Sequence, residues 1–244
     1  MDYSNFKIDM PNDVDFIINT IKSHGHQAYA VGGCVRDSIM GLTPNDWDIT
    51  TSALPSDIKE YFNKTIDTGI EHGTVTVMLH NVGYEVTTYR IDGEYKDGRH
   101  PSSVEFSDRL TDDLCRRDFT INAMAYNNVT GLVDEYGGID DINNRIIKCV
   151  GNPIERFTED ALRMMRAIRF SAQLGFSIEP DTFKAIEKLN RNIDKVSMER
   201  VCVELKKTLL SDNPDYCSLY ATTGLFNNIL PVIADNLTGR YAKK

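Results

Sequence analysis

Two aspartates one residue apart, Asp46 and Asp48, follow a glycine pair and an arginine in the N-terminal half of the chain. In a strand, residues i and i+2 point to the same face, so the two carboxylates would project together while Trp47 and Ile49 face the core. Two carboxylates on one face repel each other unless a cation lies between them. Mg²⁺ fits, because it prefers oxygen ligands and shares them with substrate phosphates. The alternative for an isolated pair is a solvated polar strand end.

The glycine pair, Gly32 and Gly33, precedes a predicted helical turn, which would leave backbone N–H groups to bind a phosphate. Arg36 would add charge-assisted donors. The alternative is an ordinary tight turn with Arg36 in a surface ion pair with Asp37.

A third acid, Glu85, lies in a predicted strand. If that strand pairs beside the one with the aspartates, three carboxylates converge, as two-metal phosphoryl transfer requires.

The elements expected around these residues are those of an α/β head. Apolar spacing and turn residues predict helices over 12–24 and 55–62, a helical turn over 34–40, and strands over 27–31, 46–50, 73–80 and 84–90. The last two strands would form a hairpin joined through Asn81, Val82 and Gly83. The polar segment 94–103 is expected to be a mobile loop.

From about Asp140 the strand signals fade, and amphipathic helices are predicted over 157–174, 180–190 and 197–210. We therefore expect three parts in the chain. They are a catalytic head over 1–139, a helical neck over 140–235 and a disordered tail over 236–244.

The predicted helix 157–174 carries polar residues at helical spacing. Asp160 and Arg163 would share one face, where a carboxylate accepts from an exocyclic amine and a guanidinium donates to a ring nitrogen or carbonyl. C and A present an amine beside an acceptor, whereas U and G present a carbonyl, so this pair could select C and A. The alternative is a dipole-complementing first turn with Thr158 as N-cap, followed by a solvated arginine row. The residues expected in the core are Ala161, Met164, Met165 and Ile168.

Composition excludes several classes of protein. The chain has 244 residues and a net charge of −9, with 9 Lys and Arg against 19 Asp and Glu in residues 1–115 but 18 against 17 in residues 116–244. The five cysteines form no CxxC pair, which favours reduced thiols over a disulfide framework or a zinc site. The five histidines show no metal-ligand spacing. No apolar run is long enough to span a bilayer and no signal peptide is present, so we expect a cytoplasmic protein without a membrane partner.

Five segments, in chain order, resemble the motifs of one family. They are GGCVRDSIMGLTPNDWDITT, RRDFTINAMAY, VDEYGGIDDINNRIIKCVG, EDALRMMRAIRF and SMERVCVELKK. This series is similar to that of the class II tRNA nucleotidyltransferases and bacterial poly(A) polymerases, within the nucleotidyltransferase superfamily. The resemblance implies an α+β fold, with a polymerase β-like head of mixed β-sheet and flanking helices followed by an all-α neck.

The resemblance also implies roles for individual residues. Asp46 and Asp48 would hold Mg²⁺, and Glu85 would help to activate the RNA 3′-hydroxyl. The residues implied to bind the nucleotide are Gly32, Gly33 and Arg36 at the triphosphate, Arg117 and Asp118 at the ribose, Asp160 and Arg163 at the base, and Arg166 and Arg169 near the phosphates. For the RRDFTINAM segment a structural alternative remains, with Phe119, Ile121 and Met124 in the core and Arg117 and Asp118 as a surface pair.

The function that the resemblance implies is CCA addition to the 3′ end of tRNA, using CTP and ATP without a nucleic-acid template. The polar loop that contains His100 is similar to a family loop linked to the final A addition, which disfavours a CC-only enzyme. Poly(A) synthesis, addition of A or of CC alone, and a catalytically silent RNA-binding module remain open. Family members usually continue into further helical domains, so the chain is expected to be the catalytic part of such a protein or a short member.

Overall fold

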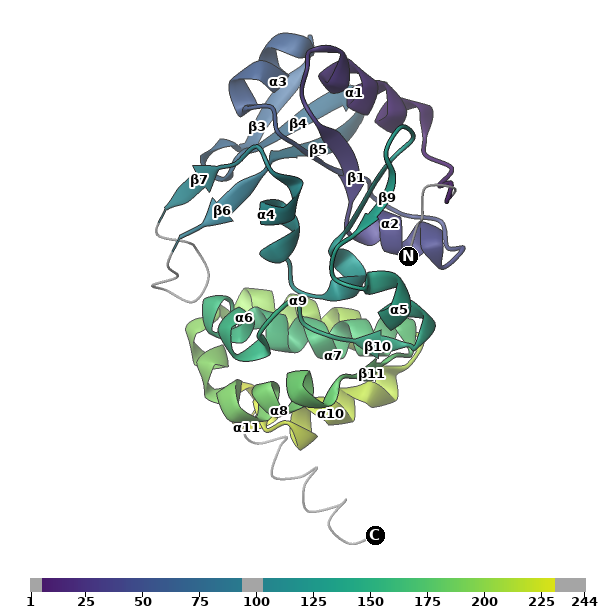
Figure 1. Ribbon diagram of the computed structural model, residues 1–244. Coiled ribbons are helices and arrows are strands. Elements are labelled where there is room, and N and C mark those ends of the chain that lie inside the picture. Colours follow the sequence, from purple (N-terminus) through teal and green to yellow (C-terminus); the bar gives the residue numbers. More distant parts are fainter. Residues whose placement is uncertain (1–5, 94–102, 231–244) are drawn as a thin grey trace, which may run out of the picture. The chain divides into compact units, whose positions relative to one another are not determined.

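A computed structural model describes residues 6–93 and 103–230 of the chain (Figure 1). These residues form two compact units, with residues 6–93 and 103–142 in the first and 143–230 in the second. The expected loop 94–103 lies almost wholly outside the described residues, and so does the expected tail 236–244. In the part of the chain that is described, no helix is long and apolar enough to cross a membrane.

The first unit is built on a mixed sheet with the strand order β3-β4-β5-β2-β1-β8-β9. Its strands are β1 (Ala28–Val31), β2 (Asp48–Thr51), β3 (Thr65–Gly69), β4 (Thr74–Leu79), β5 (Val82–Thr88), β8 (Met124–Asn127) and β9 (Gly131–Asp134). Strands β2 and β5 are parallel, and the other neighbours run antiparallel. A separate antiparallel pair joins β6 (Arg90–Asp92) to β7 (Val104–Phe106).

The helices of the first unit connect and cover these strands (Figure 1). They are α1 (Asn12–Ser23), α2 (Gly33–Ile39), α3 (Pro55–Tyr61), α4 (Leu110–Cys115), α5 (Gly138–Asn143) and the 3₁₀ turns Ile70–His72 and Thr120–Asn122. The apolar spacing that predicted α1 is its buried face, made of Val14, Ile17, Ile18 and Ile21. The helix ends where Gly25 takes φ 89°, a conformation that favours glycine.

Two expectations for this unit are corrected by the structure, and one strand was not expected. The β4–β5 hairpin turns at His80 and Asn81, whose φ angles are 49° and 65°, so Val82 and Gly83 belong to the strand. Asn tolerates this left-handed conformation, which a two-residue turn requires. Strand β2 begins at Asp48, so Asp46 lies in the preceding loop. Strand β3 was not expected, because its exposed polar residues carry little hydrophobic alternation.

The second unit is mainly helical. Its helices are α6 (Pro153–Glu159), α7 (Leu162–Leu174), α8 (Pro180–Leu189), α9 (Met198–Leu209), α10 (Ser218–Thr222), α11 (Leu225–Ile229) and the 3₁₀ turns Asn190–Lys195 and Pro214–Cys217. A short parallel pair, β10 (Ile146–Ile147) with β11 (Ser177–Ile178), adds a β element to the expected all-α neck. The methionines and aliphatic residues expected in the core of α7 are buried.

The single helix expected over 157–174 is wrong, because the chain breaks between α6 and α7. Asp160 is extended, with φ −135° and ψ 104°, and its side chain accepts a hydrogen bond from the backbone N–H of Leu162 at 3.1 Å. This side-chain acceptor satisfies one of the free N–H groups at the start of α7. Asp160 therefore precedes α7 instead of sharing a helix face with Arg163, and Thr158 lies inside α6.

Candidate active site

Strands β2 and β5 place two acidic side chains next to each other. Their parallel register pairs Ile49 with Val86, and the same register one residue earlier sets Asp48 beside Glu85. Residues in register on neighbouring strands point to the same face of the sheet. The sequence analysis expected the three carboxylates to converge only if these two strands pair, and the structure shows that they do. On the other side of β2, Val31 of β1 pairs with Asp48, immediately before the glycine pair.

The three acids all line one cavity of about 490 Å³. Its lining consists of Pro11, Asn45, Asp46, Trp47, Asp48, Val82, Gly83, Tyr84 and Glu85. Ile49 is buried as expected, but Trp47 is only half-buried and lines the cavity instead of entering the core. The reason is that Asp46 and Trp47 precede the strand, so strict alternation does not govern the direction of their side chains.

The charges in this cavity act on one another. Although Asp48 retains exposed surface, desolvation by the surrounding protein raises its pKa, the Arg117 charge opposes that shift, and Asp46 adds to it. Desolvation likewise raises the pKa of Glu85, and Asp48 and Asp46 raise it further. The mutual repulsion shows that the cavity disfavours three negative charges without a compensating cation.

The carboxylates fit a divalent cation that they share with another ligand. Among the described residues, no three His, Cys, Asp or Glu side chains are arranged to hold one metal ion by themselves. Mg²⁺ in proteins is typically bound through one or two carboxylates together with substrate phosphates and water. Asp46 and Asp48 are therefore candidate ligands whose coordination would be completed by the substrate.

The glycine turn beside the cavity is followed by a buried arginine. Arg36 donates from Nε and Nη2 to Asp37 at 2.8 and 2.7 Å, and from Nη1 to Asn122 at 2.7 Å. Asn122 in turn donates to Asp118 at 3.1 Å. Because Arg36 is only 8% exposed, the alternative of a surface ion pair is wrong, although its pairing with Asp37 is real. Gly32 has φ 83°, which explains the glycine at this turn.

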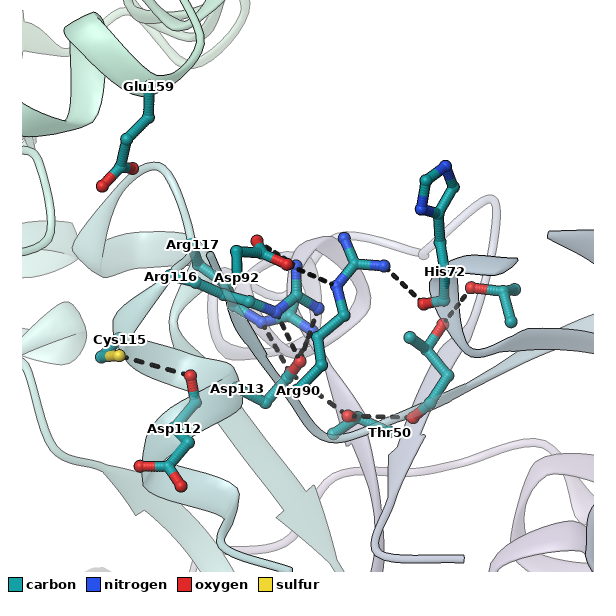
Figure 2. Close-up of polar contacts among 12 residues, drawn as sticks. Thr50, His72, Arg90, Asp92, Asp112, Asp113, Cys115, Arg116, Arg117 and Glu159 are labelled. Atoms are coloured by element: carbon teal, nitrogen blue, oxygen red, sulfur yellow. Dashed lines mark hydrogen bonds and ion pairs between the residues drawn. The ribbon is translucent and has the colours of Figure 1, made fainter. Parts of the chain in front are cut away.

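The two arginines of the RRD segment share one carboxylate that the sequence analysis missed (Figure 2). Arg116 and Arg117 both donate to Asp113, which has no exposed surface. The surface pair of Arg117 with Asp118 is therefore wrong, because Arg117 pairs with Asp113 and Asp118 is buried beside Asn122. Phe119, Ile121 and Met124 are buried, as the structural alternative for this segment expects. The signal for Asp113 was its spacing, three and four residues before the two arginines that directly follow α4.

In the second unit, Asp160 and Arg163 each have another partner. Arg200 of α9 donates to Asp160 at 3.2 Å, and Arg163 donates to Glu159 at 2.8 Å and to the backbone carbonyl of Arg156. Sequence spacing could not reveal Arg200, because it lies forty residues from Asp160. Asp160 is held by this ion pair and by the N–H of Leu162, which fixes the direction of its carboxylate.

The other two arginines of α7, Arg166 and Arg169, do not form the solvent-exposed row that the alternative expected. Arg166 lies 5.3 Å from the centre of the Phe170 ring. Arg169 is buried, donates to Glu204 at 2.5 Å and to Gln173 at 2.7 Å, and lies 3.8 Å from the centre of the Phe170 ring. Arg169 is thus a partner in a buried ion pair between α7 and α9. The expected approach of Arg166 and Arg169 to phosphates stays a prediction.

Two family descriptions match the chain. Residues 28–148 match the "Poly A polymerase head domain", and residues 175–237 match the "Probable RNA and SrmB- binding site of polymerase A". Among curated relatives, the CCA-adding enzyme of Ligilactobacillus salivarius is 49% identical over 218 residues, which cover 84% of this chain and 54% of that protein. The CCA-adding enzyme of Enterococcus faecalis is 48% identical, with 81% and 48% covered. The chain spans about half the length of the curated relatives it matches.

Solved structures give the same assignment of fold. The Bacillus stearothermophilus CCA-adding enzyme in complex with CTP superposes with a TM-score of 0.80 at 45% identity, covering 86% of this chain and 51% of that one. The Thermotoga maritima CCA-adding enzyme complexed with tRNA superposes with a TM-score of 0.76 at 25% identity, covering 95% and 56%. The mixed sheet, the ordered motifs and these matches agree, and the chain belongs to the tRNA nucleotidyltransferase and poly(A) polymerase family.

Proposed function

We propose that this protein is an RNA 3′-terminal nucleotidyltransferase that adds CCA to tRNA, using CTP and ATP and releasing pyrophosphate. The observation that carries the proposal is the carboxylate cavity, which Asp46, Asp48 and Glu85 line together. In it, Asp46 raises the pKa of Asp48, and both aspartates raise the pKa of Glu85. The relatives named CCA-adding enzyme, at about half identity, support the choice of reaction. The tRNA 3′ end is the proposed RNA partner, and the cytoplasm is the proposed location.

Mg²⁺ is the proposed cofactor, with Asp46 and Asp48 as its protein ligands. When bound, the metal would offset negative charge on the reacting phosphate and on the oxygens that attack and leave. The fit rests on the chemistry of the site, since hard carboxylate oxygens repel one another there and accept a hard divalent cation.

The chain's own groups would divide the remaining work. Glu85, whose pKa desolvation and the neighbouring aspartates raise, would accept the proton of the RNA 3′-hydroxyl as that oxygen attacks the α-phosphate in line. Gly32, Gly33 and Arg36 are proposed to contact the triphosphate, and Arg117 and Asp118 the ribose. A guanidinium held by protein carboxylates costs little further reorganisation when it binds the substrate.

An incorporation assay tests this proposal. The purified chain is given Mg²⁺ and a tRNA that ends before CCA, with each nucleoside triphosphate supplied separately and then together. We expect one or two C residues with CTP alone, a complete CCA with CTP and ATP, and no product with UTP or GTP. Incorporation of A alone would indicate A-only addition, and long A tracts would indicate poly(A) synthesis. RNA binding without metal and without incorporation would favour a catalytically silent module.

Base selection is proposed to depend on Asp160 and Arg163. Asp160→Asn keeps the oxygen that accepts from the N–H of Leu162 but replaces the oxygen paired with Arg200 by an amide donor, which suits the carbonyl of uracil. We expect the preference for CTP over UTP, measured as the ratio of kcat/KM values, to fall by about tenfold or more. Asp160→Ala should also loosen the choice, with an added loss of stability because the acceptor for Leu162 is removed.

Glu155→Gln is the matched control for base selection. Glu155 lies in the first turn of α6, is exposed, and accepts a hydrogen bond from Asn152. Its substitution should leave the CTP to UTP ratio unchanged. If the ratio also stayed unchanged in both Asp160 variants, Asp160 would have no part in the choice of base.

A further inference from the structure

Asp113 is a fully buried carboxylate to which the proposed reaction assigns no role. It lies on α4 with 0% of its surface exposed. Burial alone would raise the pKa of Asp113, but the charges of Arg117 and Arg116 and their hydrogen bonds lower it to about 2. The side chain is therefore a permanent anion placed in the interior of the first unit, beside strand β2.

The two oxygens of Asp113 bind different arginines (Figure 2). Oδ1 accepts from Nε and Nη2 of Arg116 at 3.0 and 2.5 Å, and Oδ2 accepts from Nε and Nη2 of Arg117 at 3.3 and 2.8 Å. Oδ2 also accepts from the hydroxyl of Thr50 at 3.2 Å. Two side-on pairings on one carboxylate fix the planes of both guanidinium groups, and Thr50 fixes the carboxylate relative to β2.

Nε and Nη2 of Arg117 face Asp113, so Nη1 lies on the opposite edge of the guanidinium group. That nitrogen lies 3.1 Å from the point where a Cβ on Gly32 would stand, so it faces the glycine turn. The charge of Arg117 also acts on Asp48. Its side chain is 19% exposed, which keeps it accessible to a ligand. Arg116, by contrast, is held on a second side, 3.9 Å from Asp92.

We propose that Asp113 is a positioning residue for nucleotide binding, which aims Nη1 of Arg117 at an oxygen of the ribose or triphosphate. The inference rests on the proposed function, because it assigns a nucleotide to the site beside Asp48 and the glycine turn. Asp113 does not touch the substrate. It acts through Arg117, and Thr50 connects it to the strand that carries the catalytic carboxylate.

The substitution Asp113→Asn tests the inference with almost no change in shape. The amide oxygen can accept from only one of the two arginines and carries no charge, and its Nδ2 group opposes the other. Arg117 then either faces a donor or keeps only a neutral acceptor, so its orientation is less firmly fixed. We expect the Kd for CTP in the presence of Mg²⁺, measured by calorimetry on the whole chain, to rise about tenfold. The control is Asp112→Asn on the same helix, since Asp112 accepts from Ser107 and contacts neither arginine; its Kd should change less than about twofold.

Two further variants separate positioning from a general loss of stability. In an Arg117→Ala background, adding Asp113→Asn should change the Kd for CTP less than about twofold, because the group through which Asp113 acts is gone. Thr50→Val preserves shape and removes one hydrogen bond to Oδ2, so it should raise that Kd by about two- to fivefold even if Asp113→Asn fails to fold.

The comparison of CTP with dCTP shows which oxygen Arg117 binds. If Asp113→Asn weakens CTP more than dCTP, the contact is with the ribose hydroxyl, and equal weakening places it on the triphosphate. The inference is overturned if Asp113→Asn and Thr50→Val lower the melting temperature while both keep the wild-type Kd. Absence of CTP binding by the wild-type chain would instead refute the proposed function.

Discussion

Replacing Asp48 with asparagine is expected to lower kcat for CTP incorporation by about a thousandfold or more. Asp48 is the central residue of the site, because it neighbours each of the other charged groups. It lies in register beside Glu85, shares the cavity with Asp46 and interacts with Arg117. Asparagine retains the size of the side chain but removes the negative charge that a divalent cation requires. Single-turnover incorporation on a tRNA lacking CCA measures the effect.

The same substitution should leave the fold unchanged. Desolvation and Asp46 raise the pKa of Asp48, which means that the folded protein disfavours its charged form, so a neutral isostere is expected to give a melting temperature no lower than that of the wild type. Asp67→Asn is the control. Asp67 on β3 forms an exposed ion pair with Lys59 of α3, so this variant should retain nearly full activity. Near-normal turnover by Asp48→Asn would exclude the carboxylate cavity as the site of transfer.

Replacing Glu204 with glutamine is expected to destabilise the second unit by about 3 kcal/mol or more. Glu204 and Arg169 are both buried and joined at 2.5 Å, so the substitution leaves an arginine charge in the interior with an amide in place of its counter-charge. Gln173 and the Phe170 ring would still contact that arginine. Urea denaturation followed by circular dichroism gives the free energy of unfolding.

Two comparisons separate the buried charge from the loss of a contact. The double substitution of Arg169 by Met and Glu204 by Leu removes both charges and should recover most of the stability. Asp181→Asn breaks a pair with Lys184 in which both side chains are more than two thirds exposed, and it should cost less than about 1 kcal/mol. A loss for Glu204→Gln as small as that of Asp181→Asn would show that the buried pair contributes little.

Elements with a clear local signal were predictable. The apolar face of α1, the proline that opens α3 and the alternation along β4 and β5 are all written in neighbouring residues, and the structure contains each of them. The interior positions of α7 followed in the same way, because apolar residues at helical spacing must be buried together. The ordered motifs identified the family, since their types and spacing reflect chemistry shared by its members.

Partners that are distant in sequence were not predictable. Local pattern suggested a continuous helix through Asp160, but Arg200 and the N–H of Leu162 bind its carboxylate, and an extended residue there separates α6 from α7. Asp113 resembled an ordinary helix acid. Only the packing of α4 against β2 shows that it is buried and shared by two arginines.

The sequence by itself determined which acids, arginines and glycines are available for the proposed phosphoryl transfer, and most of the strands and helices around them. The tertiary structure decided that β2 and β5 run side by side in register, which brings Asp48 beside Glu85. It also decided that Arg169 forms a buried ion pair with Glu204. The physical reason is that hydrophobic periodicity is a local property of the chain, whereas the register of strands and the pairing of buried charges depend on contacts between residues far apart in it.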